Sequence, residues 1–293
     1  MSPAESTMEN PLSLPSLASF IRTLTRNSPA NRLRHFDNSP IFDEPLVAVP
    51  DGNDPLFEQY KRVIGSHHFT PREMLDLSRH TERRPADADL APIRVICWVL
   101  PISEATRRSN AVMTSEPSRR WAHTRYYGEQ FNDDLRRAVE QHVRKNGAQA
   151  IAPAVSPLFK PLYGTPDRPS STSSERHALF AAGLGTFGLC DGFLTAAGKA
   201  MRCGSVVVNV PLPVSPRPYS SHREACVYFT KGTCGECLSR CPAGAIGPNG
   251  HDKGNCDLYQ RETLLPLRER YGVPITGCGL CQTAVPCESC LPT

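Results

Sequence analysis

The chain has 293 residues, 33 Lys and Arg against 29 Asp and Glu, a formal net charge of +4, and 12 cysteines. This length is sufficient to bury a core, so disulfide staples are not needed, and no apolar run is long enough to span a bilayer. The small positive charge contains no Lys/Arg block, which argues against a nucleic-acid-binding surface. With no targeting segment in view, we expect a soluble, cytoplasmic protein without a membrane partner, in which clustered thiols bind metal or act in catalysis.

The first predicted elements lie in the N-terminal third. Residues 1–45 are rich in Pro, Ser and Asn with one amphipathic patch, LASFIRTLTR, and we expect a loosely attached arm. In TPREMLDLSRH, Thr70 is placed as a helix N-cap, Pro71 at the first helical position and Glu73 at the capping-box position. The β-branched and aromatic run IRVICWVLP, bounded by prolines, predicts a buried strand over residues 93–100.

Helices and strands alternate through the middle of the chain. FNDDLRRAVEQHVRKNG predicts an amphipathic helix, because apolar residues recur every four positions from Phe131 to Val143 before Gly147. AQAIAPAV and GSVVVNVPL predict further strands, and ERHALFAA predicts a helix over residues 175–182. Alternation of this kind across residues 60–212 indicates an α/β sandwich.

A dense glycine segment follows the last of these helices, with Gly183, Gly185 and Gly188 in GLGTFG. Backbone without side chains suits close approach by a bulky ligand or by another segment of the chain. The segment does not match a dinucleotide fingerprint, since it follows a helix instead of opening one after a strand. Two interpretations stay open: the wall of a ligand site, or a helix end packed tightly on a strand.

Cysteines dominate the sequence after residue 220. They stand at Cys226, Cys234, Cys237, Cys241, Cys256, Cys278, Cys281, Cys287 and Cys290. The run CxxCxxxCP that ends at Pro242 is the second half of the bacterial ferredoxin pattern, in which the cysteine before proline crosses to a second [4Fe–4S] cluster. This spacing predicts iron–sulfur ligands.

Tetrahedral zinc is the alternative metal for such pairs. A site made of Cys234, Cys237, Cys278 and Cys281 would supply four thiolates. That site would leave the other clustered cysteines without a role and the Cys-Pro signature unexplained, so ligand number and spacing favour iron and sulfide.

Several segments resemble, in order, the C-terminal two thirds of epoxyqueuosine reductases and, more distantly, corrinoid reductive dehalogenases. They are ERHALFAAGLGTFG, GSVVVNV, CGECLSRCPAGAI, CDLY and GCGLCQ, within about residues 90–290. The resemblance implies an α+β fold, in which a nitroreductase-like α/β sandwich domain precedes a small double [4Fe–4S] ferredoxin-like module. We therefore expect an arm over 1–45, a corrinoid and substrate domain over 46–220 and a cluster domain over 221–293.

The same resemblance assigns the cluster ligands position by position. One cluster would be held by Cys241, Cys256, Cys278 and Cys281. The other would be held by Cys234, Cys237, Cys287 and a fourth ligand, because the family's first motif cysteine falls on Lys231. We choose Cys226, which lies just upstream in the same segment, with Cys290 as the fallback.

The function implied by the resemblance is an iron–sulfur oxidoreductase. Electrons from an external ferredoxin- or flavodoxin-like donor would pass through two [4Fe–4S] clusters to a bound corrinoid, cobalamin, that reduces a small-molecule substrate. Gly183, Gly185 and Gly188 would form part of the corrinoid site. A protein acid would supply the proton. The candidates for this acid are Tyr126, Tyr127, Tyr163, Asp167, His177 and Asp191.

Two departures from the family pattern bear on the substrate. The aspartate that serves as proton donor falls on Pro169, and the lysine after GLGxxG falls on Leu189. For this reason tRNA is not expected as a partner, and the substrate stays open. Two other classes of function also remain: a ferredoxin-type electron-transfer protein without a corrinoid, and a zinc-stabilised interaction protein.

Overall fold

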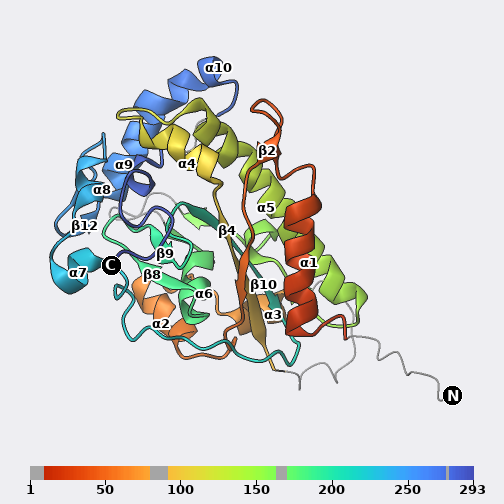
Figure 1. The fold of residues 1–293 in the computed structure, drawn as a ribbon. Coiled ribbons are helices and arrows are strands. Elements are labelled where there is room, and N and C mark those ends of the chain that lie inside the picture. The colour runs from red at the N-terminus through yellow and green to blue at the C-terminus, as the bar shows by residue number, and fades with distance from the viewer. Residues whose placement is uncertain (1–9, 80–91, 163–169, 275–276) are drawn as a thin grey trace.

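The computed structural model describes residues 10–79, 92–162, 170–274 and 277–293, built around one antiparallel sheet (Figure 1). The sheet has the strand order β3-β4-β10-β5. Its strands are β3 Leu46–Ala48, β4 Arg94–Pro101, β10 Met201–Val208 and β5 Ala150–Ile151. The central pair, β4 and β10, is in register over eight residues, from Met201 opposite Pro101 to Val208 opposite Arg94. These are the two strands that the longest apolar runs predicted.

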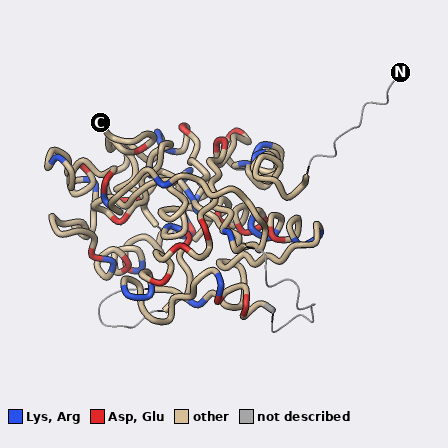
Figure 2. Tube along the Cα trace, turned by 90° about the horizontal axis from the view of Figure 1, so that it is seen from below, with Lys and Arg blue, Asp and Glu red and all other residues tan. Residues whose placement is uncertain are grey.

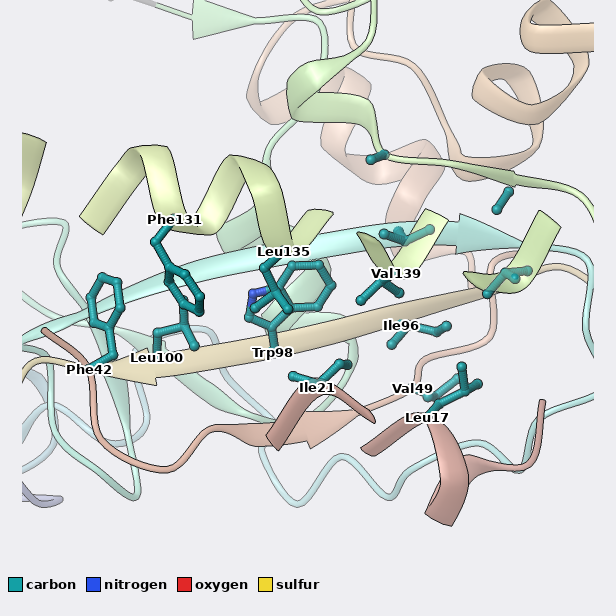
Figure 3. Close-up of a cluster of buried hydrophobic side chains, with 14 of the residues drawn as sticks. Leu17, Ile21, Phe42, Val49, Ile96, Trp98, Leu100, Phe131, Leu135 and Val139 are labelled. Carbon is teal, nitrogen blue, oxygen red and sulfur yellow. The ribbon is translucent and has the colours of Figure 1, made fainter. Parts of the chain in front are cut away.

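Helices cover both faces of the sheet, so both faces of β4 are buried. Ile96, Trp98 and Leu100 point to the face covered by α1 Leu14–Asn27 and α5 Arg119–Lys145 (Figure 3). The alternate residues of β4, Val95 and Val99 among them, face α2 Leu56–Val63, α3 Pro71–Arg79 and α6 Glu175–Ala181. A strand buried on both sides must be apolar throughout, which is why IRVICWVLP contains no alternation. The expected sandwich of helices and sheet is therefore present.

The prediction of a loosely attached arm over residues 1–45 is wrong for the described part. Leu17 and Ile21 of α1 are 0% exposed and pack into the same core as α5. Ser13 caps α1 by accepting a hydrogen bond from the Ser16 amide at 3.3 Å. The short hairpin β1 Arg32–Leu33 and β2 Ser39–Pro40 follows. The amphipathic patch is thus a core helix, because it covers, together with α5, an apolar face of the sheet.

The predicted start of a helix agrees with the structure where the sequence contains a recognisable N-cap. The Thr70 capping box is confirmed, since its hydroxyl accepts from the Glu73 amide at 3.2 Å and its own amide donates to the Glu73 carboxylate at 2.8 Å. Helix α5 instead begins at Arg119, well before the predicted start at Phe131. Four consecutive residues in its first turns, Trp121–Thr124, are buried. Burial on every side leaves no apolar stripe of helical period in the sequence, so this part of the helix was not predicted.

Short elements make up the rest of the described chain. Before the cysteine region these are α4 Glu104–Ala111, a 3₁₀ turn Pro153–Val155, β6 Pro161–Leu162, β7 Ser170–Ser171, β8 Gly185–Phe187 and β9 Phe193–Thr195. Within it they are α7 Val227–Lys231, α8 Glu236–Ser239, β11 Ile246–Gly247, β12 Gly250–His251, α9 Lys253–Tyr259, a π turn Gln260–Leu264, α10 Arg268–Tyr271 and 3₁₀ turns Leu265–Leu267 and Leu280–Gln282.

The cysteine region packs on α4 and α5 at one end of the sheet (Figure 1). Arg240 donates to the carbonyl of Met113 at 2.8 Å, and the Tyr271 hydroxyl donates to that of Pro117 at 2.6 Å. Contacts therefore cross the predicted boundary at residue 220. The finer assignments, a nitroreductase-like sandwich and a ferredoxin-like module, stay predictions.

Charged residues of both signs alternate along the chain (Figure 2). The long helix α5 carries both signs in its middle, with acidic residues from Glu129 to Glu140 between basic ends. Within the described ranges, no helix combines the length and apolarity needed to cross a membrane.

One buried ion pair joins the helices on opposite faces of the sheet. Strand β5 pairs only with the end of β10, so β10 is an edge strand at Cys203 and Ser205. Arg136 of α5 donates to the Cys203 carbonyl at 2.9 Å, and Glu175 of α6 accepts from the Ser205 amide at 2.9 Å. Arg136 and Glu175 also meet each other at 2.6 Å. Together they close the sheet edge and hold the start of α6.

Arg136 is 3% exposed and also pairs with Asp133 at 2.6 Å and Glu129 at 2.9 Å. We expect Arg136→Met to lower the free energy of unfolding by about 3–5 kcal/mol, because it leaves buried carboxylate charge without a partner. Urea unfolding at neutral pH would measure this loss.

The matched control is Arg137→Met on the same helix, where the side chain is 52% exposed and pairs with Asp134. We expect a change of about 0.5 kcal/mol or less there, since exposed ion pairs contribute little. Equal losses in the two variants would contradict the structural role of Arg136.

Candidate functional site

Four cysteines from three separate segments line one small cavity beside α7 and α8. They are Cys226, Cys234, Cys237 and Cys287. Cys226 is the N-cap of α7 and Cys237 lies within α8. Cys287 lies in the C-terminal loop, and its backbone carbonyl accepts a hydrogen bond from the Lys199 amide at 2.9 Å. We call these four residues the first thiol group.

We call Cys241, Cys256, Cys278 and Cys281 the second thiol group, and two of them, Cys241 and Cys281, pack against the same buried cluster as Cys226, Cys237 and Cys287. Burial raises the pKa of the Cys278 thiol, and the neighbouring Cys256 and Cys241 raise it further, so these three sulfurs lie close together. The Ala245 amide donates to Cys241 Sγ at 3.3 Å, and the Gln260 side chain donates to Cys256 Sγ at 3.4 Å. The sulfurs therefore face polar donors as well as each other.

The two candidates for the last ligand of the first thiol group lie in different surroundings. Cys226 is 9% exposed and lines the cavity. Cys290 is exposed, and its thiol points to the Pro286 carbonyl within its own loop at 3.6 Å.

The two CxxC pairs of the zinc alternative fall into different thiol groups. Cys234 and Cys237 line the first cavity, whereas Cys278 lies near Cys241 and Cys256, and Cys281 lies near Cys278 and Cys190. Across the described ranges, no three side chains of His, Cys, Asp or Glu are arranged to hold a metal ion. A [4Fe–4S] cube stands between its four ligands, so its thiols need not converge on one point.

Sequence reasoning missed two residues that lie between the thiol groups. Cys190, which flanks the glycine segment and is not among the predicted ligands, is 5% exposed. The thiols of Cys237 and Cys281, one from each group, lower its pKa. Lys199, the single charged residue of the stretch AAGKAM, is 3% exposed, and its Nζ lies 3.4 Å from Cys190 Sγ.

A larger pocket of about 560 Å³ lies on the other side of the glycine segment. Apolar side chains of α2 and α6 and the ring of Phe187 form part of its wall. Arg176, Arg223 and Lys253 give it basic groups. Gly188 lines both this pocket and the first thiol cavity, so the two spaces share a wall.

We predicted that Gly183, Gly185 and Gly188 would all line a ligand site, but of these three only Gly188 lines the pocket. A Cβ on Gly183, whose φ is +73°, would lie 2.3 Å from the Pro216 carbonyl oxygen. A Cβ on Gly185 would lie 1.9 Å from the Leu194 carbonyl oxygen. Gly183 and Gly185 therefore allow backbone packing, the alternative that the sequence left open.

The candidate proton donors are dispersed. His177 and Asp191 line the large pocket. Tyr126 and Tyr127 lie on α5 and pack near Tyr271, away from that pocket. Tyr163 and Asp167 lie outside the described residues.

Burial, followed by the charge of Arg176, lowers the pKa of His177 to about 3, so its imidazole is neutral near pH 7. The Ser174 hydroxyl lies 2.7 Å from its Nδ1. Burial raises the pKa of Asp191, but His251 and Lys253 outweigh burial and hold it below its usual value. Asp191 is therefore ionised, and neither residue carries an acidic proton near neutral pH.

His251 connects the pocket to the second thiol group. Its Nδ1 lies 3.7 Å from the Asp191 carboxylate. Asp191, followed by Cys256, raises the pKa of His251 to about 9. His251 is thus protonated at neutral pH, beside Asp191 of the pocket and Cys256 of the second thiol group.

The curated relatives of the chain are epoxyqueuosine reductases, which confirms the resemblance predicted from the cysteine region. The Pseudomonas aeruginosa enzyme is 28% identical over 224 residues, which are 73% of this chain and 57% of the relative. The Escherichia coli enzyme is 31% identical over 160 residues, 52% of this chain and 38% of the relative. The chain therefore spans about half the length of the curated relatives it matches, and no family model matches it.

Solved structures support the fold. A catabolic reductive dehalogenase in complex with 3-bromo-4-hydroxybenzoic acid matches 97% of this chain and 38% of its own, with a TM-score of 0.53 and 12% identity. Epoxyqueuosine reductase with an epoxyqueuosine-modified tRNA-Tyr stem loop matches 94% of this chain and 64% of its own, with a TM-score of 0.46 and 16% identity.

These comparisons contradict the prediction that tRNA is not a partner. The curated relatives carry the name epoxyqueuosine reductase, the activity that this prediction had set aside. The absence of a Lys/Arg block and the departures at Pro169 and Leu189 were therefore not sufficient grounds to exclude tRNA.

The glycine contacts generate a stability prediction. Gly185→Ala should lower the free energy of unfolding by about 1–3 kcal/mol, because the Leu194 carbonyl that it meets is backbone and cannot move aside. Gly188→Ala, the control, meets only the flexible Leu194 Cδ1 at 2.6 Å and should cost less than about 1 kcal/mol. Denaturant unfolding compares the two, and a larger loss for Gly188→Ala would contradict the packing role of Gly185.

Proposed function

We propose that the protein is an iron–sulfur oxidoreductase that carries electrons through two [4Fe–4S] clusters to a corrinoid in the large pocket. The observation that carries this proposal is the shared wall at Gly188, which lines both the first thiol cavity and the pocket. A redox group in the pocket would be the immediate neighbour of a cluster in the cavity.

The donor set fits two clusters. Each thiol group contains four cysteines, the ligand number of a [4Fe–4S] cluster. Cys226, Cys234, Cys237 and Cys287 would hold the first cluster, and Cys241, Cys256, Cys278 and Cys281 the second. Cys241 directly precedes Pro242 and belongs with the second group, as the crossing ligand of the ferredoxin pattern does.

The pocket fits a large ligand with apolar and anionic parts. Its volume of about 560 Å³ lies within the usual range for cofactor sites. Phe187 and the apolar residues of α2 suit a macrocycle, and Arg176, Arg223 and Lys253 suit a phosphate group. A bound corrinoid supplies a cobalt centre that takes up electrons and delivers them to a substrate.

The chain's own residues hold the proton that reduction needs. His251 is protonated beside Asp191, and Lys253 lies 4.0 Å from the same carboxylate. Asp191 orients these two cations at the pocket wall, and neutral His177 offers a hydrogen-bonding imidazole beside them. The similarity to enzymes named reductases supports this arrangement as a reductive site. Electrons enter from an external donor.

The first prediction from this proposal is iron content. Anaerobic reconstitution of the full chain should give about eight iron and eight acid-labile sulfide per chain, by the ligand count of two clusters. About four irons or fewer in the wild-type protein, or about one to two zincs, would refute the two-cluster proposal.

Cys226→Ala and Cys290→Ala form a matched pair within this experiment. We expect Cys226→Ala to lose or destabilise one cluster, because it removes a thiol from the first cavity, and Cys290→Ala to keep the wild-type iron content. The reverse result would assign the last ligand to Cys290.

The second prediction concerns the pocket. Hydroxocobalamin titrated into the anaerobic protein should bind, as followed by the cobalt spectrum. Val63→Trp should weaken binding about tenfold or more, because Val63 lines the pocket and a bulky ring would narrow its mouth. Val112→Trp is the control, since Val112 is 79% exposed and Val63 73% exposed, but Val112 does not line the pocket.

If no cobalamin binds while both clusters are intact and reducible, the protein is an electron-transfer module without a corrinoid. If cobalamin binds but Val63→Trp has no effect, the corrinoid site lies elsewhere.

A further inference from the structure

Lys199 carries a buried ammonium group in surroundings made largely of sulfur. The side chain is 3% exposed, and its Nζ lies 3.4 Å from Cys190 Sγ. It lines the same cavity as the first thiol group. Among the residues that the structure describes, none of the ion pairs includes Lys199, and its ammonium group faces the sulfurs of Cys190 and Cys287.

An ammonium group removed from water requires a nearby negative charge. Its desolvation penalty is large, and attraction to an opposite charge in the same low-dielectric surroundings is what offsets it. The groups nearest Lys199 are the sulfurs of Cys190, Cys287, Cys237 and Cys281, and three of these residues, Cys237, Cys281 and Cys287, are proposed cluster ligands. A [4Fe–4S] cluster bound by four thiolates is an anion, and it would supply the missing counter-charge.

The backbone fixes Lys199 relative to the ligand loop. Its own amide donates to the Cys287 carbonyl at 2.9 Å, and the next amide, of Ala200, donates to the Glu288 carbonyl at 3.1 Å. A Cβ on Gly198 would lie 2.3 Å from the Glu288 carbonyl oxygen, so the turn and the loop are in direct contact. The backbone at Lys199 is therefore held against the loop that contains Cys287.

We propose that Lys199 is the fixed positive charge that raises the reduction potential of the cluster in the first thiol cavity, an inference that rests on the proposed function because it requires that cluster. Reduction adds one electron to the cluster and makes it more negative, and no bond forms or breaks. A cation held beside it stabilises the reduced state more than the oxidised state.

The charge of Lys199 would raise the reduction potential of the first cluster more than that of the second. Cys237 and Cys287, two neighbours of Lys199, belong to the first thiol group, and only Cys281 belongs to the second. The first cluster thus becomes the better electron acceptor of the two. It is also the cluster that shares the Gly188 wall with the large pocket, so the charge of Lys199 would draw electrons toward the pocket.

The test is a redox titration of the reconstituted full-length protein with dithionite, followed by paramagnetic resonance of the reduced clusters. Lys199→Met should shift the reduction equilibrium of one cluster at least tenfold toward the oxidised state, which is about 59 mV for one electron, and shift the other cluster less. Lys231→Met is the matched control, a lysine in the same module at the end of α7 that is exposed to solvent. It should stay within about twofold of the wild type, because solvent screens its charge.

Unchanged equilibria for both clusters in Lys199→Met, or a shift equal to that of Lys231→Met, would overturn the proposal. Lys199→Gln, which keeps a polar group without the charge, is measured in parallel in case the methionine variant binds less iron.

Folded variants at position 199 that retain only about four irons would overturn the proposal, because the lysine would then be needed to hold a cluster and not to set its reduction potential. Variants that unfold or lose all iron would overturn it in favour of a structural role. A wild-type protein that binds no iron would refute the proposed function itself, whereas a loaded protein without a potential shift would refute only the role of Lys199.

Discussion

The site depends on how the open edge of β10 is closed. Arg136 and Glu175 satisfy the carbonyl of Cys203 and the amide of Ser205, which β5 is too short to reach. Glu175 begins the segment that forms the pocket wall, and Ser205 lies just beyond the end of it. Both ends of this segment are therefore tied to one buried ion pair. Gly188, Cys190 and Lys199 all lie between those two ends.

Charge compensation explains the arrangement inside that segment. Lys199 places a cation among thiols, and His251 places a second cation between the Asp191 carboxylate and Cys256. Each thiol group is thus accompanied by a positive group that the surrounding fold shields from solvent. Under the proposed function, one cation adjusts an electron carrier, and the other holds a proton near the site where electrons arrive.

Where the chain lacks a cysteine that the family pattern expects, another cysteine lies nearby in the sequence. The resemblance implies that Lys231 takes the position of the family's first motif cysteine, and Cys226, at the start of the same helix, lines the same cavity as Cys234 and Cys237. A ligand can move along the chain by about one helical turn and still reach the same cavity, because α7 folds back over it. A cluster in this cavity would need a sulfur atom at a given place, and cysteines at different positions in the sequence could supply it.

Local patterns in the sequence determined the elements whose cause is local. Strand β4 follows from an apolar run between prolines, α3 from the Thr70 capping box, and α6 from its start at Glu175. Cysteine spacing and the order of motifs were also enough to identify the relatives. Only the tertiary structure decided the rest, because the cause lies in residues far apart in the chain. Helix α1 is part of the core because the sheet leaves a face for it, Gly185 is required by the carbonyl of Leu194, and Lys199 is buried because the C-terminal loop with Cys287 closes over it.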